Sequence, residues 1–252
     1  MRFISFLYGV ACYLVFLIVF LYFIAFIADV NFLNLVPKTI SANLAGITPV
    51  LAADMTMAII INIALMIGFG LQHSIMARSG FKSIITKIIP EHTERSTFCM
   101  ISGVTLAAVM YFWQPIGGLI WDVQSPMLRN VIWGLFFAGW ALIFISTFLT
   151  DHFDLFGLRQ VYLNMAQKAY SPVVFTEVLF YKWIRHPMML GILIAFWAVP
   201  TMTIGHLLFS IGMSIYVMAG IHFEEKGLAK ELGQTYVDYT ARSRRVIPLP
   251  KG

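Results

Sequence analysis

Two short polar runs stand on either side of a long apolar segment near the C-terminus. The first is Arg185-His186-Pro187, and the second contains the adjacent carboxylates Glu224 and Glu225. Adjacent carboxylates at a membrane boundary are costly unless they meet water or a cation, which makes them candidates for binding a positively charged ligand. Pro187 has a structural explanation, because proline suits the first turn of a helix, where its missing N–H costs nothing.

Further polar and aromatic residues follow the second run. Tyr236, Tyr239 and Arg242 repeat at three-residue spacing, so a helix would present two aromatic rings and a cation on one face. Tyrosines also form ordinary belts at membrane interfaces, and an arginine there also serves topology. Both interpretations stay open at this point.

Two histidine-containing stretches lie earlier in the chain. Asp151, His152, Asp154 and Arg159 come directly after an apolar block, and their alternation with phenylalanine and leucine suggests a partly buried lid. A solvated helix end would explain the same residues. His73 lies within another apolar block, where an ionisable residue is a functional candidate by default, with a hydrogen-bonded interior histidine as the alternative.

The composition excludes an ordinary soluble domain. The chain has 252 residues, of which 60% are hydrophobic and 12% charged, about half the usual charged fraction. The net charge of +5 comes with no basic run interleaved with aromatic residues, so no nucleic-acid partner is expected. Cys12 and Cys99 are far apart in apolar surroundings, which predicts core packing and neither a disulfide framework nor a metal site.

Four apolar blocks are each long enough to cross a bilayer, which takes about 20 residues. They cover residues 3–28, 55–76, 98–114 and 131–150. Only short polar joints separate the blocks. We therefore predict an all-α integral membrane protein that forms a single membrane domain over residues 1–252.

The last apolar block, residues 188–221, is too long for one simple span. As a single helix it would reach ~50 Å, well beyond a ~30 Å hydrocarbon core. Pro200 and Gly205 interrupt it. The prediction is therefore four transmembrane helices plus a C-terminal helical hairpin, with a tight turn between the two helices of the hairpin.

The distribution of basic residues supports the hairpin. With the N-terminus inside, only Lys38 and Arg129 of the 17 basic residues fall outside. A single crossing by the last block would export the basic residues of the tail, 222–252, against the positive-inside tendency. We expect a multi-pass protein of the cell inner (plasma) membrane with both termini cytoplasmic.

The order of the C-terminal motifs resembles a known superfamily. Arg-His-Pro, a long apolar stretch, Glu-Glu-x-x-Leu, Leu-Gly-x-x-Tyr-x-x-Tyr-x-x-Arg and a final Ile-Pro follow one another between Arg185 and Pro248. This arrangement is similar to the C-terminal half of the isoprenylcysteine carboxyl methyltransferase and phospholipid methyltransferase superfamily. The resemblance implies an S-adenosylmethionine site at the cytoplasmic membrane face. Met189 departs from the pattern, because many relatives carry tyrosine there.

The N-terminal half narrows the resemblance. Gln72-His73-Ser74, Pro90-Glu91-His92 and the stretch from Asp151 to Val161 resemble the methanethiol S-methyltransferase branch, which is close to the NnrU-type membrane proteins. The resemblance implies a small thiol acceptor, methanethiol, and dimethyl sulfide as the product. The other partner expected is membrane lipid, and the sequence gives no oligomeric state.

The resemblance also implies roles for individual residues. Glu224 and Glu225 would bind the ribose hydroxyls or the ammonium of the donor, and Arg185 and His186 its carboxylate or adenine. Arg242 would reach one of the two glutamates. The full set of expected donor-site residues is Arg185, His186, Pro187, Gly191, His222, Glu224, Glu225, Tyr236, Tyr239 and Arg242.

The acceptor needs activation, because an alkanethiol with a pKa at or above the ~8.5 of cysteine is at most a few per cent ionised at neutral pH. His152, His73 and His222 are candidate bases, in that order, and Asp151, Asp154 and Arg159 complete the expected catalytic region. An isoprenylcysteine carboxyl or phospholipid methyltransferase is the alternative within the superfamily. A non-enzymatic NnrU-type transport or assembly protein fits less well, because the polar residues gather at one face and form no path across the spans.

Overall fold

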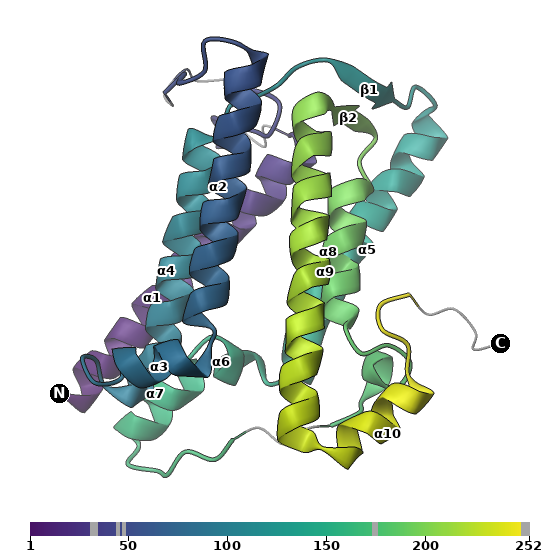
Figure 1. Ribbon diagram of the computed structural model, residues 1–252. Helices are drawn as coiled ribbons and strands as arrows, with labels where there is room; N and C mark the ends of the chain where they lie inside the picture. The colour runs from purple at the N-terminus through teal and green to yellow at the C-terminus, as the bar shows by residue number, and fades with distance from the viewer. Residues whose placement is uncertain (31–34, 44–45, 47–48, 173–175, 248–252) are drawn as a thin grey trace. The chain divides into compact units, whose positions relative to one another are not determined.

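The computed structural model describes residues 1–30, 35–43, 46, 49–172 and 176–247, and helices dominate them (Figure 1). In chain order the elements are α1 (Arg2–Ala28), α2 (Met55–Met76), α3 (Ser79–Ile85), α4 (Glu91–Phe112), β1 (Leu119–Asp122), α5 (Pro126–Leu149), α6 (His152–Leu155), α7 (Leu158–Met165), the 3₁₀ turn η2 (Leu179–Lys182), α8 (Pro187–Trp197), β2 (Thr201–Thr203), α9 (Ile204–Leu232) and α10 (Gln234–Arg242).

Within the described residues, five helices are long and apolar enough to cross a membrane: α1, α2, α4, α5 and α9. This confirms an α-helical membrane protein. Two helices begin earlier than predicted. The first turn of α4 carries Glu91 and Glu94, which suit the positive end of the helix dipole but lower the local hydropathy. α5 begins at Pro126, in the first helical position.

The predicted hairpin corresponds to α8 and α9. α8 has 11 residues, about 16 Å of helix, so it is too short to span a bilayer alone. Within this pair, Ser210 Oγ donates to the Phe196 carbonyl at 2.8 Å and Trp197 Nε1 donates to Ser214 Oγ at 3.0 Å. The predicted tight turn is wrong in detail, because residues 198–203 form a longer connection that contains β2, and Gly205 already lies in α9.

α9 extends well past the predicted end of the hairpin at Ile221 and reaches Leu232. Glu224 and Glu225 therefore lie on a regular helix and not at the start of a tail. β1 and β2 pair as a two-stranded sheet, which the sequence did not predict. Both strands are short, with four and three residues, and periodicity over so few residues carries little signal.

The chain packs as two compact units, which are described separately. Unit 1 comprises Met1–Ile120, His152–Pro172 and Thr203–Phe209, and unit 2 comprises Trp121–Asp151, Val173–Met202 and Ser210–Gly252. In unit 1, α1 packs against α4 and α7, and α2 packs against α4. Cys12 and Cys99 are free and buried in this unit, as predicted.

In unit 2, α5 packs closely against α8 through facing glycines. A Cβ on Gly191 would lie 2.6 Å from the Gly139 carbonyl oxygen, and a Cβ on Gly139 would lie 2.8 Å from the Gly191 carbonyl oxygen. Only residues without a side chain allow the two backbones to approach so closely. The start of α8, which carries the Arg-His-Pro motif, is thereby held on α5.

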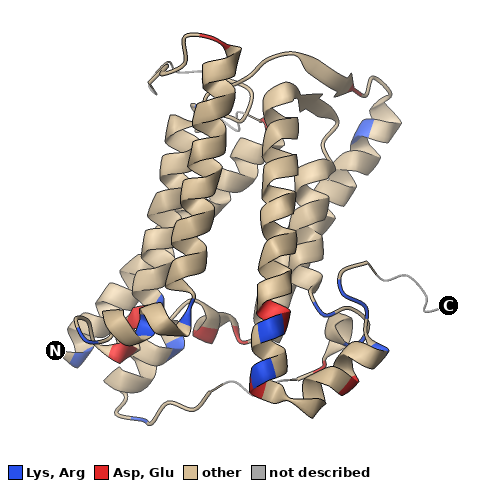
Figure 2. Cartoon of the chain, viewed as in Figure 1, with Lys and Arg blue, Asp and Glu red and all other residues tan. Residues whose placement is uncertain are grey.

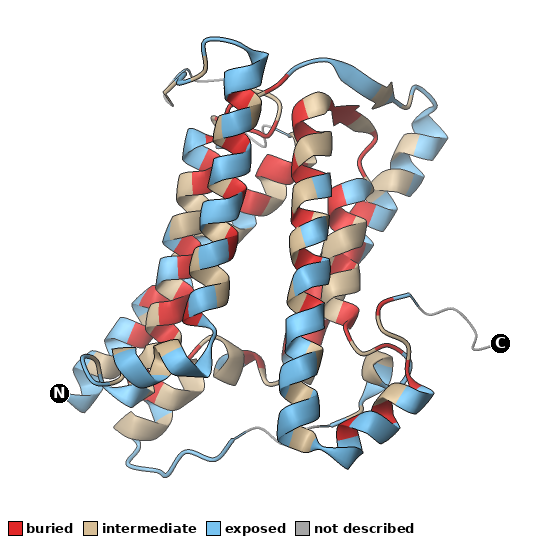
Figure 3. Cartoon of the chain, in the orientation of Figure 1, coloured by how far each residue is buried: buried red, intermediate tan, exposed pale blue. Residues whose placement is uncertain are grey.

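In each unit, apolar residues are exposed along the helices and charged residues gather near helix ends, as expected for a protein in a bilayer. Large apolar side chains such as Ile18, Ile60, Phe137 and Ile215 are exposed. Exposed residues recur along the length of the helices (Figure 3), which suits a hydrocarbon solvent. Charged residues gather at the N-terminal end of α1 and around α3 in unit 1, and at the C-terminal end of α9 and in α10 in unit 2 (Figure 2).

Candidate active site

The residues directly before α8 meet the C-terminal part of α9 in unit 2 through ionic contacts. Arg185 Nε donates to Glu225 Oε1 at 2.8 Å, and His186 Nε2 lies 3.3 Å from the same oxygen. His186 Nδ1 is 3.7 Å from Glu224 Oε2. Residues about 40 positions apart in the sequence, which the motifs singled out separately, therefore form one cluster.

A second arginine completes the pairing of Glu225. Arg245 Nε lies 2.8 Å from Glu225 Oε2. Arg185 also donates through NH1 to the carbonyls of Ser243, at 2.8 Å, and Thr240, at 3.4 Å. Sequence reasoning did not single out Arg245, although the cluster Arg242-Ser-Arg-Arg directly before Val-Ile-Pro was a usable signal.

Backbone pairing brings Arg245 to this position. Ile184 and Arg244 form a parallel bridge, flanked by hydrogen bonds from Arg185 N to Arg244 O at 2.8 Å and from His186 N to Arg245 O at 3.2 Å. Val246 then packs with Val217 and Ile221 in a buried apolar cluster against which Met189 also packs. Pro248, the last residue of the predicted motif, lies outside the described residues.

The two adjacent glutamates differ in their surroundings. The Glu225 side chain is 18% exposed and contacts two arginines, whereas the Glu224 side chain is 48% exposed. Consecutive residues on a helix point about 100° apart, because 3.6 residues complete a turn. The Glu225 carboxylate therefore lies inside the ionic cluster, and the more exposed Glu224 carboxylate lies at its edge.

His186 is buried beneath this cluster, with 4% of its side chain exposed. Burial lowers the pKa of its imidazole, and the neighbouring Glu225 carboxylate opposes that shift. Desolvation disfavours the charged ring more strongly than one carboxylate, itself paired with arginine, favours it. The uncharged ring can donate one hydrogen bond and accept one.

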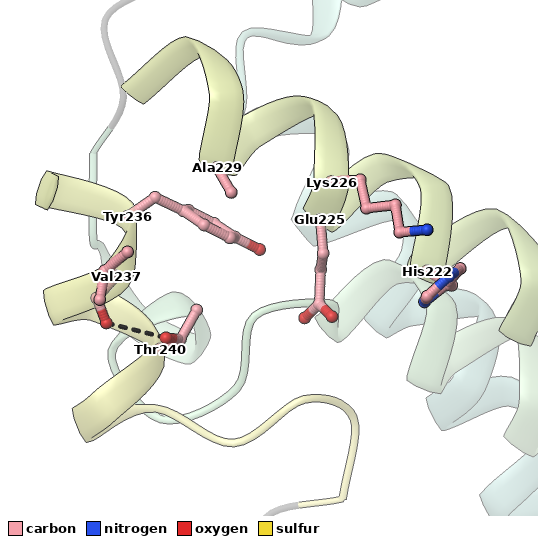
Figure 4. Close-up of a pocket in the computed structure, with 7 residues that line it drawn as sticks. All are labelled: His222, Glu225, Lys226, Ala229, Tyr236, Val237 and Thr240. Atoms are coloured by element: carbon pink, nitrogen blue, oxygen red, sulfur yellow. Dashed lines mark hydrogen bonds between the residues drawn. The ribbon is translucent and has the colours of Figure 1, made fainter. Parts of the chain in front are cut away.

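A cavity of about 260 Å³ opens beside Glu225, between α9 and α10 (Figure 4). Tyr236 extends from α10 toward Glu225, and its buried hydroxyl makes no hydrogen bond among the described residues. Burial raises the pKa of Tyr236 to about 12, so the hydroxyl stays protonated at neutral pH. The cavity is lined by His222, Glu225, Lys226, Ala229, Tyr236, Val237 and Thr240.

Two of the expected donor residues have other partners. The Tyr239 hydroxyl donates to the Tyr181 carbonyl at 2.6 Å, so it joins α10 to η2. Arg242 forms an ion pair with Glu177, whose Oε2 lies 3.1 Å from Arg242 Nε. The expectation that Arg242 reaches Glu224 or Glu225 is wrong, because α10 ends at Arg242 and Arg245 approaches Glu225 instead.

Gly191 and Pro187 occupy positions with clear structural roles. Gly191 allows the close contact between α8 and α5, and Pro187 is the first residue of α8. Their predicted contacts with a donor remain predictions. His222, by contrast, lies on the cavity wall with Glu225 and Tyr236.

His152 lies in unit 1, at the start of α6, and is buried. Its Nε2 is 2.8 Å from the hydroxyl of Tyr13 on α1. The ring of Phe156 lies 4.8 Å from the imidazole, between centroids, and that of Phe153 lies 5.4 Å from it. The first candidate base thus lies among aromatic rings.

The stretch predicted as a lid is fastened to α4. Arg95 Nε donates to the Leu155 carbonyl at 2.7 Å and Ser96 Oγ to the Gly157 carbonyl at 3.2 Å. Gly157 has φ 85°, and a Cβ there would lie 2.5 Å from Ser96 N, so only glycine fits. Arg159 NH1 also forms an ion pair within the stretch, 3.0 Å from Asp154 Oδ1. Whether the stretch covers a substrate stays a prediction.

The remaining residues of the expected catalytic region are Asp151 and His73. Asp151, directly before His152, has a positive φ of 68°. His73 Nδ1 lies 3.2 Å from Ser102 Oγ, and its ring contacts Phe69 and Phe98. These contacts match the interpretation of His73 as a hydrogen-bonded interior histidine, and its role as a base stays a prediction. No group of three or more metal-ligating side chains occurs within the described residues.

Comparison with curated proteins decides the family. The chain is 43% identical over 249 residues to a methanethiol S-methyltransferase of Mycobacterium tuberculosis, covering 99% of this chain and 98% of that protein. It is 42% identical to methanethiol S-methyltransferase 1 of Bradyrhizobium diazoefficiens, covering 98% of this chain and 83% of that protein. The chain belongs to the methanethiol S-methyltransferase family.

More distant relatives extend beyond bacteria. Nurim of Xenopus laevis is 31% identical over 171 residues, which covers 62% of this chain and 58% of that protein. No family model and no solved structure matches the chain. Membership of the methanethiol S-methyltransferase family therefore rests on the nearly full-length relatives, and it confirms the branch that the N-terminal motifs indicated.

Proposed function

We propose that this protein is a membrane S-methyltransferase that transfers a methyl group from S-adenosylmethionine to methanethiol, giving dimethyl sulfide. The observation that carries the proposal is 43% identity over nearly the whole length of a methanethiol S-methyltransferase. The ionic cluster of Arg185, Glu225 and Arg245 supports it, because it supplies a charged site beside the cavity.

The residues of unit 2 fit the chemistry of this donor. S-adenosylmethionine supplies a methyl group on a positively charged sulfur, and it also carries an ammonium, a carboxylate, ribose hydroxyls and adenine. Glu224 and Glu225 match the cationic and hydroxyl groups, and the Tyr236 hydroxyl is a buried polar group that needs a partner. The 260 Å³ cavity is smaller than the roughly 300 to 1,000 Å³ of typical ligand sites, so it would hold only part of the donor.

The thiol must lose its proton as it reacts. In this proposal an imidazole, first His152 and otherwise His73 or His222, accepts the proton from sulfur. The thiolate electron pair forms the new carbon–sulfur bond, while the electrons of the broken bond stay on the donor sulfur. Asp154 and Arg159 hold the stretch that carries His152, through their ion pair.

The membrane setting suits both substrates. We propose an inner (plasma) membrane location with cytoplasmic termini, because this arrangement places the charged donor-site residues where a water-soluble donor is present. Methanethiol and the uncharged thioether product both dissolve in the bilayer. Cysteines introduced at Gln234 and Ser125 should be labelled by impermeant reagents from the inner and outer sides, respectively. The reverse pattern would contradict the topology.

Headspace analysis tests the activity directly. Purified protein with methanethiol and S-adenosylmethionine carrying a deuterated methyl group should release dimethyl sulfide with one deuterated methyl. Methylation of a prenylated cysteine or a phospholipid without thioether formation would overturn the acceptor and keep the donor. Absence of any donor binding or methyl transfer would favour a non-enzymatic protein.

A further inference from the structure

Glu225 has both carboxylate oxygens paired with arginine side chains. Oε1 accepts from Arg185 Nε at 2.8 Å, and Oε2 lies 2.8 Å from Arg245 Nε. His186 adds a contact to Oε1 at 3.3 Å. Oε1 is therefore hydrogen-bonded by Arg185, whereas Oε2 is paired with Arg245 by distance and charge, since the buried Arg245 Nε makes no hydrogen bond among the described residues. Glu224, with 48% of its side chain exposed, has a single contact in this cluster, 3.7 Å from His186.

The segment Ser243–Val246, which we call the C-terminal clasp, brings one of these arginines to Glu225. It runs parallel to residues 183–186 and is fixed by Arg244 N donating to Trp183 O at 2.7 Å and Arg185 N donating to Arg244 O at 2.8 Å. Val246, the last residue of the clasp, is buried with Val217 and Ile221. The clasp is therefore attached by backbone pairing and by an apolar residue, and the Arg245 side chain is not needed to hold it in place.

Because the clasp is held without the Arg245 side chain, that side chain can serve another purpose. Its side chain is 38% exposed as a whole, although the Nε atom that faces Glu225 is itself buried. The same guanidinium fixes the carboxylate that lines the cavity beside Tyr236. A guanidinium that orients a cavity-lining carboxylate, and that is not needed to hold the clasp, is well placed to position a ligand.

We propose that Arg245 is a positioning residue for the methyl donor: together with Arg185 it holds the Glu225 carboxylate where it lines the cavity, and Glu224, outside that lining, contacts the part of the donor that the cavity does not hold. The two adjacent glutamates thus have different roles. This inference rests on the proposed function, because it assigns the donor to the same cluster.

Calorimetric titration with S-adenosylhomocysteine provides the test. Arg245→Ala should weaken binding about tenfold, because a charge-assisted contact to a partly buried carboxylate is lost. Arg245→Lys should recover part of the loss, since it keeps the charge without the planar guanidinium. Lys230→Ala, which removes an exposed cation from the same helix as Glu225, should bind like the wild type.

Double-mutant cycles separate the two glutamates. Combining Arg245→Ala with Glu225→Gln should weaken S-adenosylhomocysteine binding little more than the larger of the two single changes does, because both remove the same contact. Combining Arg245→Ala with Glu224→Gln should weaken binding by nearly the product of the fold-losses that the two single changes give. Additive behaviour with Glu225, or strong coupling with Glu224, would overturn the assignment.

Steady-state kinetics exclude a purely structural effect. Arg245→Ala should raise the KM for S-adenosylmethionine about tenfold and leave kcat at saturating donor within about twofold. A fall in kcat at unchanged KM, as from a smaller active fraction, would contradict a positioning role.

If Arg245→Ala cannot be purified folded, Arg245→Lys takes its place, and unaltered binding by that variant counts against the proposal. A wild type that binds no S-adenosylhomocysteine would overturn the donor itself, whereas equal binding by wild type and Arg245→Ala would overturn only this inference.

Discussion

The ionic cluster of unit 2 and the histidine region of unit 1 are held by different forces. Around Glu225, three segments distant in sequence meet through arginine–carboxylate pairs and backbone bonds. Around His152, the neighbours are aromatic rings and the hydroxyl of Tyr13. The first environment suits a ligand with several charges, and the second suits a small apolar thiol. The predictions below test whether donor binding and thiol chemistry divide along this line.

The largest expected effect concerns thiol chemistry in unit 1. His152→Ala should lower turnover by roughly 10² to 10⁴, because a positioned base contributes that much to proton transfer. Donor affinity should hold. The loss should shrink as the pH rises toward the pKa of the thiol, which for an alkanethiol lies at or above the ~8.5 of cysteine, since an ionised thiol needs no base. Dimethyl sulfide production measured across that pH range gives the result.

His92→Ala is the matched control, because it removes another histidine of unit 1 that lies outside the proposed machinery. Its rate should stay near that of the wild type. A pH-independent defect in His152→Ala, or an equal defect in both variants, would count against His152 as a base and weaken the division between the two regions.

Arg185→Ala should have the next largest effect, on donor binding. Arg185 is 12% exposed and serves Glu225 and two carbonyls, and its removal leaves a partly buried carboxylate with fewer partners. We expect donor affinity to fall about a hundredfold and stability by ~3 kcal/mol. Arg159→Ala breaks a pair that holds the stretch carrying His152 and should leave donor affinity unchanged. Calorimetry and thermal unfolding of both variants test this contrast.

How much the sequence predicted also differs between the two regions. The order Arg-His-Pro, Glu-Glu, Tyr-x-x-Tyr-x-x-Arg correctly indicated that both ends of the last apolar block carry polar residues that converge, because a hairpin returns the chain to its starting side. It did not predict which arginine reaches Glu225. Arg242 and Arg245 are equivalent by type, and the choice depends on the end of α10 and on the bridge between Ile184 and Arg244.

The aromatic contacts of His152 could not be predicted either. Tyr13 lies 139 residues away in the sequence, on an α1 helix whose apolar residues show little periodicity that would single out one face. Similarly, Gly191 was assigned to the donor site from its position in a motif, whereas its contact with Gly139 follows from helix packing. Long-range packing between uniformly apolar helices leaves almost no pattern in a single sequence.

Gly191→Ala should affect stability rather than binding. Its new Cβ would meet the Gly139 carbonyl at 2.6 Å, and overpacking of this kind costs about 1 to 3 kcal/mol. Thermal unfolding should move to lower temperature while the affinity of the remaining folded protein for the donor holds. Gly68→Ala is the control, because nothing lies within 4 Å of a Cβ there. A selective loss of donor affinity in Gly191→Ala would restore the predicted donor contact.

The smallest effect expected is the pH dependence that His186 gives to unit 2. Burial lowers its pKa, although Glu225 opposes the shift and Arg185 and Arg245 add to it. An unfolded histidine titrates near pH 6.5, so below that value the unfolded chain binds a proton that the folded chain resists. The stabilisation is complete above about pH 6.5 and is lost as the pH falls toward the folded pKa. The thermal midpoint of the wild type should therefore decrease between about pH 7.5 and 5.5, a window in which most carboxylates stay ionised. His186→Asn should show a flatter profile, since the other histidines contribute equally to both proteins. If acidification instead stabilised the wild type relative to His186→Asn, the attraction of Glu225 would outweigh desolvation, and His186 would be a cation in the folded cluster.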